Sequence, residues 1–401
     1  MFKPAKEQME IALKGVAQVV SEEELLEKFE KSYKTQTPLT IKLGLDPSAP
    51  DIHLGHAVVL RKIKQLQDLG HEVTIIIGDF TGKIGDPSGR SKGRVSLGEE
   101  TVKANAKTYF QQLFKVLDPK KTTVRYNSEW LTKLNFEEVL KLAATTSVAR
   151  MLERDDFQKR YANQTPIGIH EFFYPLMQAY DSIEIKADIE LGGTDQTFNV
   201  LMGRTLQKHF GMEKQVALFM PLLEGLDGVE KMSKSLDNYI GLTEPVEVMF
   251  KKVMEVPDEL ILKYYELATD EHPKKITEIK ERLEKGANPR DIKMELATII
   301  TKLYWGEAKT TRAIDYFKAL FQKNEIPENV PEIHLIEKTL EAMVPMLIDE
   351  EVIQSKSEFT RLIKQNGVRL NQNKLTLEQL QIVLKSGDIL QIGKKRVLRF
   401  V

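Results

Sequence analysis

Two histidines three residues apart form the first group of side chains that could do chemistry. They lie in His53-Leu54-Gly55-His56, which follows an apolar stretch and begins a helical pattern. Residues three apart share one face of a helix, and the free N–H groups at a helix start favour a phosphate. Gly55 has no side chain to block a ligand lying against the helix. The group suits nucleotide binding, although paired histidines are also common on protein surfaces.

A glycine-rich loop forms the second group. Residues 78–90 contain four glycines and come directly after an apolar run. Glycines permit close approach of the backbone to a ligand, and loops at the carboxyl ends of parallel strands bind ligands in α/β folds. Arg90 and Arg94 carry charges that suit phosphates. The spacing is not that of a P-loop, and a tight connection with solvated basic residues is the alternative interpretation.

The third group is the run from Lys231 to Ser235, which reads Lys-Met-Ser-Lys-Ser. Two flexible ammonium groups separated by small hydroxyl residues can close over a triphosphate. Taken by itself, the run is equally typical of a polar surface loop.

A fourth group lies on one helical stripe. Tyr174, Gln178 and Asp181 are four and three residues apart, so they share a helix face. Three hydrogen-bonding side chains on one stripe are unusual for a face that packs on a core, although an amphipathic helix with a solvated face would also show them. The run Gly192-Gly-Thr-Asp-Gln196 follows soon after.

The elements that must position these groups follow an α/β pattern. Residues 39–45 and 72–78 read as buried strands on either side of a helix over 54–69. Such uniformly apolar runs suit a parallel sheet covered on both faces. A second set is expected at 185–190, 196–209 and 216–223. Residues 257–323 read as helices broken at two prolines.

Composition sets the class of protein. The 401 residues are 41% hydrophobic and 29% charged, with no cysteine, as expected for a globular protein without disulfides. No apolar run reaches the roughly 18 residues that cross a bilayer, and the first residues predict no secretory signal. Net charge is −1 overall. Residues 351–401 carry ten basic and four acidic residues, a net +6, which indicates a polyanionic partner or a solvated lysine-rich surface.

Taken together, the motifs and their order along the chain resemble those of a known enzyme family. The His-Leu-Gly-His run, followed roughly 180 residues later by Lys-Met-Ser-Lys-Ser, resembles the signature pair of class I aminoacyl-tRNA synthetases. The stripe at Tyr174, Gln178 and Asp181, with Gly-Gly-Thr-Asp-Gln after it, is similar to the tyrosine-binding segment of the bacterial tyrosyl-tRNA synthetases. Residues 357–371 and 387–395 resemble a small S4-type RNA-binding domain. The resemblance covers about residues 30 to 401.

The resemblance implies roles for individual residues. The catalytic positions are His53, His56, Lys231 and Lys234. Positions that contact ATP are Ser48, Gly55, Arg90, Arg94, Gly193, Asp195, Ser233 and Ser235. Positions that bind tyrosine are Asp46, Asp86, Tyr174, Gln178, Asp181 and Gln196, with Asp181 accepting from the phenol hydroxyl. Positions that bind tRNA are Arg361, Lys364, Arg369, Lys394 and Lys395. Many relatives carry a tyrosine that touches the substrate hydroxyl where this chain has Lys42.

The resemblance also implies an architecture and partners. We expect a Rossmann-like parallel-sheet catalytic domain over 1–240, a helical domain over 241–325, a linker over 326–341 and a small α+β S4-like RNA-binding domain over 342–401. The implied substrates are ATP with Mg²⁺, L-tyrosine and tRNA(Tyr), with no bound zinc. A homodimer in the cytoplasm, without a membrane partner, is expected.

Three rival functions remain at this stage. A tryptophanyl-tRNA synthetase shares the class signatures, but the stripe at 174–181 and the S4-like tail speak against it. A non-catalytic RNA-binding descendant would not need both histidines and both lysines. A nucleotidyltransferase of the same superfamily would need neither the helical region nor the tail.

Overall fold

The structure is a computed structural model that describes residues 2–46, 52–84, 112–319, 330–350, 352–393 and 396–401. The chain divides into two compact units. The first comprises residues 1–245 with 252–304, and the second comprises residues 246–251 with 305–401. The domain boundaries expected from the sequence stay predictions.

A six-stranded sheet forms the centre of the first unit. Its strands stand in the order β1-β6-β5-β2-β3-β4, and every neighbouring pair is parallel except the antiparallel pair of β1 with β6. The strands are β1 (Gln18–Val20), β2 (Thr40–Leu45), β3 (Glu72–Ile77), β4 (Thr122–Tyr126), β5 (Ile189–Gly193) and β6 (Val216–Met220). Residues 216–220 of β6 are all buried, as expected for a strand covered on both faces.

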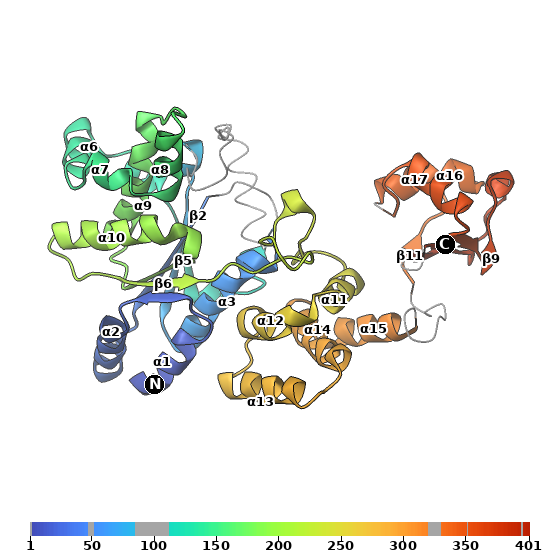
Figure 1. Ribbon diagram of the computed structural model, residues 1–401, viewed down its shortest axis with the longest axis horizontal. Helices are drawn as coiled ribbons and strands as arrows, with labels where there is room; N and C mark the ends of the chain where they lie inside the picture. The colour runs from blue at the N-terminus through green and yellow to red at the C-terminus, as the bar shows by residue number, and fades with distance from the viewer. Residues whose placement is uncertain (1, 47–51, 85–111, 320–329, 351, 394–395) are drawn as a thin grey trace. The chain divides into compact units, whose positions relative to one another are not determined.

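Two crossover helices wind the sheet in opposite directions. Helix α3 (Leu54–Asp68) joins β2 to β3, and α10 (Thr197–His209) joins β5 to β6. Crossovers between parallel strands are right-handed as a rule, so helices that lead away from the central pair in opposite directions cover opposite faces. Figure 1 shows α3 on one side of the sheet and α10 on the other. Strands β2 and β5 therefore meet at the point where the winding reverses, which is where open α/β sheets bind ligands.

Further helices flank this sheet. Gly70, with φ of 106°, turns the chain out of α3 because glycine adopts positive φ without steric cost. Among the residues described up to Glu184, the further helices are α1 (Ala5–Leu13), α2 (Glu22–Thr35), α5 (Ser128–Leu131), α6 (Phe136–Ala143), α7 (Val148–Met151), α8 (Asp155–Ala162) and α9 (Phe173–Glu184).

The expected elements agree with the structure except at the ends of two strands. The strand expected over 216–223 ends at Met220, because the chain leaves the sheet at Pro221. The strands at 39–45 and 72–78 and the helix at 54–69 are confirmed, as is the helix near 196–209. The strand expected over 185–190 is wrong in its start, because α9 continues to Glu184 and the chain turns at Lys186, with φ of 52°. Strand β5 begins only at Ile189.

Helices dominate residues 246–318. They are α11 (Val246–Met254), α12 (Ile261–Ala268), α13 (Pro273–Glu284), α14 (Pro289–Trp305) and α15 (Glu307–Lys318). Pro273 and Pro289 are the first residues of α13 and α14, where the missing N–H has no helical partner to lose. The expected helical character and its breaks at these prolines are confirmed.

The C-terminal part is a small mixed sheet covered by two helices. Its strands stand in the order β7-β11-β10-β8-β9. They are β7 (Glu332–Ile333), β8 (Val368–Leu370), β9 (Asn373–Lys374), β10 (Ile389–Ile392) and β11 (Arg396–Phe400), and the helices are α16 (Leu340–Asp349) and α17 (Lys356–Lys364). Strand β7 lies within the range expected to be a linker and pairs with β11.

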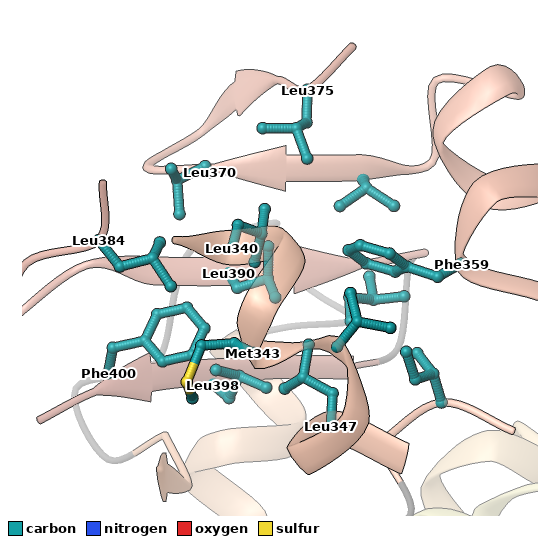
Figure 2. Packing of buried hydrophobic residues seen from close by; sticks show 14 of the residues in the cluster. Leu340, Met343, Leu347, Phe359, Leu370, Leu375, Leu384, Leu390, Leu398 and Phe400 are labelled. Atoms are coloured by element: carbon teal, nitrogen blue, oxygen red, sulfur yellow. The ribbon is translucent and has the colours of Figure 1, made fainter. Parts of the chain in front are cut away.

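A continuous apolar core holds this C-terminal part together. Figure 2 shows Leu340, Met343 and Leu347 of α16 against Leu398 and Phe400 of β11. All five are nearly inaccessible to water, and Phe359 of α17 belongs to the same cluster. The α/β class with a helical region and a small mixed C-terminal domain is therefore confirmed. Among the described residues, no helix is both long and apolar enough to cross a membrane.

Candidate functional site

A cavity of about 480 Å³ opens at the carboxyl ends of β2 and β5. It brings together all the described residues that were expected to bind ATP or tyrosine, except Ser235. They are Asp46, His53, Gly55, His56, Tyr174, Gln178, Asp181, Gly193, Asp195, Gln196, Lys231, Ser233 and Lys234. Ser48, Asp86, Arg90 and Arg94 lie outside the described residues.

The two histidines stand at the N-terminus of α3. Their rings are stacked with centroids 3.8 Å apart, and the backbone N–H of His53 lies 3.4 Å from Nδ1 of His56. The described residues offer no hydrogen-bond partner to Nδ1 of His53, which is buried. A buried polar atom without a protein partner beside a cavity is suited to a ligand.

Both imidazoles are held in their neutral form. Burial lowers the pKa of His53 to about 2, helped by His56 and the two lysines of the neighbouring loop. For His56, desolvation is again the largest cause and the charges of Lys231 and Lys234 follow; together they lower its pKa to about 4. Unlike His53, His56 is exposed where it lines the cavity, so water offsets part of this effect. Neutral rings can donate a hydrogen bond without adding charge of their own.

The lysine loop lies over the start of α3. The Met232 sulfur accepts from the backbone N–H of Gly55 at 3.3 Å. Asn238 holds the loop in place through two hydrogen bonds. Its Oδ1 accepts from the backbone N–H of Ser233 at 2.7 Å, and its side-chain amide donates to Asp227 at 2.5 Å. Lys231 and Lys234 both line the cavity, and Nζ of Lys234 lies 5.6 Å from the centre of the Tyr239 ring.

Asp46 ties the tip of β2 to the substrate stripe. Its two oxygens accept from the Tyr174 hydroxyl and from the Thr81 hydroxyl, each at 2.8 Å. A side chain on Gly78 would overlap both Asp46 and Thr81. Glycine at the end of β3 is therefore required by this close approach rather than by backbone conformation.

Asp181 is the buried carboxylate of the cavity. Its Oδ1 accepts from Nε1 of Trp130 at 2.8 Å, and its side chain is 3% exposed. Burial raises the pKa of Asp181 to about 7, and this effect outweighs the opposing charge of Lys42 and the hydrogen bonds from Trp130 and Asn127. A carboxylate removed from water in this way needs a hydrogen-bond donor.

Three residues of this site were missed from the sequence. Asn127, Trp130 and Thr81 frame the pocket around Asp46 and Asp181. Asn127 follows directly on β4, so the position at the carboxyl end of a parallel strand was the signal. Strand β4 was not identified from the sequence, and the signal was lost with it.

The residues expected to bind RNA lie in the C-terminal part. Arg361 and Lys364 are exposed in the last turns of α17, and Arg369 is exposed on β8. Lys394 and Lys395 lie outside the described residues. In the part of the chain that the structure describes, no group of three or more histidines, aspartates and glutamates stands ready to hold a metal ion.

Comparisons with known proteins agree on one family. The family described as class I tRNA synthetases (W and Y) matches residues 34–322. A tyrosine–tRNA ligase 2 of Clostridium acetobutylicum is 58% identical over 403 residues, which cover all of both chains. A tyrosine–tRNA ligase of Carboxydothermus hydrogenoformans is 52% identical over 99% of this chain and 98% of its own.

Solved structures show the same fold at lower identity. A C-terminally truncated mitochondrial tyrosyl-tRNA synthetase of Aspergillus nidulans has a TM-score of 0.65 and 24% identity, covering 79% of this chain and 99% of its own. A tyrosyl-tRNA synthetase of Archaeoglobus fulgidus complexed with L-tyrosine has a TM-score of 0.59 and 24% identity, covering 77% of this chain and 99% of its own.

The desolvation of the histidine pair gives a testable prediction. Because burial depresses both pKa values, the ring resonances of His53 and His56 should keep neutral chemical shifts at about pH 5.5, where a free histidine is mostly charged. Ring NMR spectra across pH, assigned with His53→Gln and His56→Gln, measure this. Midpoints near the ordinary value of about 6.5 would contradict the described environment.

Proposed function

This chain belongs to the class I tyrosyl-tRNA synthetases, and on that premise we propose how its residues divide the work of a tyrosine–tRNA ligase. The enzyme activates L-tyrosine with ATP to tyrosyl-adenylate and then transfers tyrosine to the 3′ end of tRNA(Tyr). The observation that supports this division best is the cavity at β2 and β5, which joins a histidine pair, two lysines and one buried carboxylate.

Tyrosine binds at the inner end of the cavity. Asp181 accepts a hydrogen bond from the phenol hydroxyl, since it is the carboxylate buried against Trp130. Tyr174 and Gln178, on the same face of α9, surround the substrate ammonium together with Asp86, and Asp46 fixes Tyr174. Gln196 lies beside the reacting carboxylate.

ATP binds where α3 begins. Gly55 leaves room for the nucleotide against the helix, while Gly193 and Asp195 receive the ribose. Ser48, Arg90, Arg94, Ser233 and Ser235 serve the phosphate side. ATP enters as its magnesium complex, with the metal held by phosphate and water oxygens as Mg²⁺ prefers, and no zinc takes part.

Activation is an in-line substitution at the α-phosphorus. A carboxylate oxygen of tyrosine forms the new P–O bond, and the bond to the bridging oxygen of the β-phosphate breaks, so that pyrophosphate leaves with the electron pair. The nucleophile is already ionised, so the protein's task is positioning and charge stabilisation. His53 and His56 donate as neutral rings, and Lys231 and Lys234 meet the growing negative charge.

Transfer to tRNA follows on the same site. The terminal ribose hydroxyl attacks the carbonyl carbon of the adenylate, loses its proton, and AMP leaves. The S4-like domain over 342–401 holds the RNA through Arg361, Lys364, Arg369, Lys394 and Lys395, because exposed cations release counterions from phosphates. The helical domain over 241–325 serves the anticodon end of the tRNA, and the expected linker over 326–341 joins it to the S4-like domain only up to β7, which pairs into the C-terminal sheet. The reaction belongs to the cytoplasm.

We also infer a homodimer through the face made by α6 and α7. Three large apolar side chains of this face are exposed to water: Phe136 at 77%, Leu140 at 52% and Val148 at 64%. Large apolar side chains grouped on a surface mark an interface. A hollow of about 330 Å³ lies beside them, lined by residues 145–147, Arg150 and Phe198 among others. We propose that a second copy of the chain covers this face, because in a two-fold symmetric dimer the same surface of each copy meets its counterpart.

A tyrosine-dependent exchange assay tests the substrate and the role of Asp181. Wild-type protein should exchange pyrophosphate into ATP with tyrosine, and not with tryptophan, the substrate of the closest rival. Asp181→Asn should lower kcat/KM for tyrosine by about 10–100-fold, the size of a charged hydrogen bond, and leave KM for ATP unchanged. Asp188→Asn, at the opposite end of β5, is the matched control.

The same assay carries a pH prediction. Because the pKa of Asp181 is raised to about 7, the ionised acceptor is lost as pH falls through that value, and wild-type kcat/KM for tyrosine should fall with it. Asp181→Asn should lack this acid limb. An Asp181→Asn enzyme with wild-type kcat/KM and an unchanged pH profile would refute the role of Asp181. Wild-type protein whose pyrophosphate exchange does not depend on tyrosine would refute the function.

A charge variant tests the RNA surface. Arg361→Gln with Lys364→Gln should weaken tRNA binding and lower the slope of log K against log salt by about 1.5, since each lost phosphate contact removes roughly 0.7–0.9. Tyrosine-dependent exchange should be unchanged. Lys31→Gln with Lys34→Gln, equally exposed on α2, is the control. If both variants charge tRNA equally and show equal salt slopes, Arg361 and Lys364 do not contact the RNA and serve only to keep the surface hydrated.

A single charge tests the dimer face. Leu140→Glu places a carboxylate within the apolar group on α6, so the mass measured by light scattering should fall from two chains to one. Ile336→Glu, at an apolar side chain 68% exposed in the C-terminal part, should leave the mass unchanged. A wild-type protein that elutes as one chain at micromolar concentration would exclude the dimer.

A further inference from the structure

A buried ion pair joins the two central strands beneath the cavity. Lys42 of β2 and Glu190 of β5 stand opposite each other in register, and Lys42 Nζ lies 2.9 Å from Glu190 Oε1. Their side chains are 0% and 1% exposed. The neighbouring residues of both strands, Ile41, Leu43 and Leu191, are apolar and buried, so this pair stands in an otherwise hydrophobic sheet.

Every donor of the Lys42 ammonium has an acceptor. Besides Glu190, it donates to the backbone carbonyl of Gln178 at 2.9 Å and to the Ser182 hydroxyl at 2.7 Å. Both acceptors belong to α9. Lys42 therefore fastens α9 to β2 at two points that enclose Asp181 in the sequence.

Glu190 completes the same network from β5. Its Oε2 accepts from the Ser182 hydroxyl at 3.1 Å and from the Gln215 amide. Its Oε1 lies 3.4 Å from Nε2 of Gln178. The network thus holds Gln178 through both its backbone and its side chain.

Stability alone is a weak reason for such a pair. A buried ion pair is often no more stabilising than apolar side chains of the same volume, because both charges lose their hydration. This pair interrupts the apolar interior of the sheet, yet among the described residues all its side-chain connections except the one to Gln215 lead to α9, the helix whose residues Tyr174, Gln178 and Asp181 line the cavity. Its position therefore points to the site rather than to the core.

The pair also sets the electrostatic field at Asp181. Lys42 from β2 and Glu190 from β5 are the charged groups whose fields act on Asp181 among the described residues, while Trp130 and Asn127 supply neutral hydrogen bonds. The attraction of Lys42 ranks above the repulsion of Glu190. The net effect favours the charged form of Asp181 against the cost of its burial.

We propose that Lys42 and Glu190 are positioning residues for substrate specificity, which fix the Gln178–Asp181 face of α9 and thereby the recognition of the tyrosine hydroxyl. The inference rests on the proposed role of Asp181 as the hydroxyl acceptor. Neither residue of the pair lines the cavity, so both act through α9 and not by contact with the substrate.

The decisive variant is Lys42→Met with Glu190→Gln in the full chain. It removes both charges, keeps the volume, and leaves an amide to bond Ser182 and Gln215. We expect a folded protein whose ratio of kcat/KM for tyrosine over phenylalanine falls at least about tenfold, because one hydrogen bond to a charged acceptor is commonly of that size. KM for ATP should stay within about twofold, and the acid limb of kcat/KM for tyrosine should move to higher pH.

A matched variant separates positioning from stability. Lys28, 4% exposed and paired with Asp188 at 3.1 Å, is another buried lysine of the first unit. Lys28→Met should lower thermal stability and leave the tyrosine-to-phenylalanine ratio and the pH profile unchanged. If the double variant does not fold, Ser182→Ala removes one contact from each member of the pair and should lower the ratio about threefold, a part of the hydrogen-bond contribution.

Each outcome decides the matter. A folded double variant with wild-type specificity and an unmoved acid limb overturns the proposal, as does an unchanged ratio in Ser182→Ala. If Lys28→Met lowers the tyrosine-to-phenylalanine ratio as much as the double variant does, the effect comes from general destabilisation, and this result also overturns the proposal. Wild-type protein without tyrosine-dependent exchange is a separate result, which refutes the proposed function instead.

Discussion

The parallel pairing of β2 with β5 is the constraint on which the rest of the first unit depends. Their crossover helices lead to opposite faces of the sheet and so diverge at the carboxyl ends of this pair. The cavity lies at that edge of the sheet. Motifs that are far apart in the sequence meet there because the topology brings their loops to one edge of the sheet.

The electrostatics of the cavity suit a reaction between two anions. The pKa values of the histidines are lowered by burial and by the nearby lysines, so the positive charge beside the start of α3 comes from Lys231 and Lys234 and not from the imidazoles. The acidic group lies deep in the pocket at Asp181, 3% exposed. On the roles proposed above, positive charge at the phosphate end and a carboxylate at the other end orient tyrosine in one direction.

Much of this arrangement could be predicted from the sequence, because it depends on local signals. The strand at 39–45 and the helix at 54–69 follow from apolar runs and a terminal glycine, and the stripe at Tyr174, Gln178 and Asp181 follows from helical spacing. Asn127 and Trp130 could not be placed, since β4 is only partly buried and gave no clear strand pattern. The role of Lys42 depends on a partner 148 residues away in β5, and no local pattern reveals such a pairing.

The positions of the phenol ring and of the adenylate phosphate in the cavity test the proposed roles most directly. A crystal structure with a non-hydrolysable tyrosyl-adenylate analogue measures this directly. We predict that the phenol oxygen lies within about 3 Å of an Asp181 oxygen, the ordinary hydrogen-bond distance, with the phosphate mimic beside His53 and the lysine loop. An analogue bound in the reverse direction, or with its phenol oxygen away from Asp181, would contradict it.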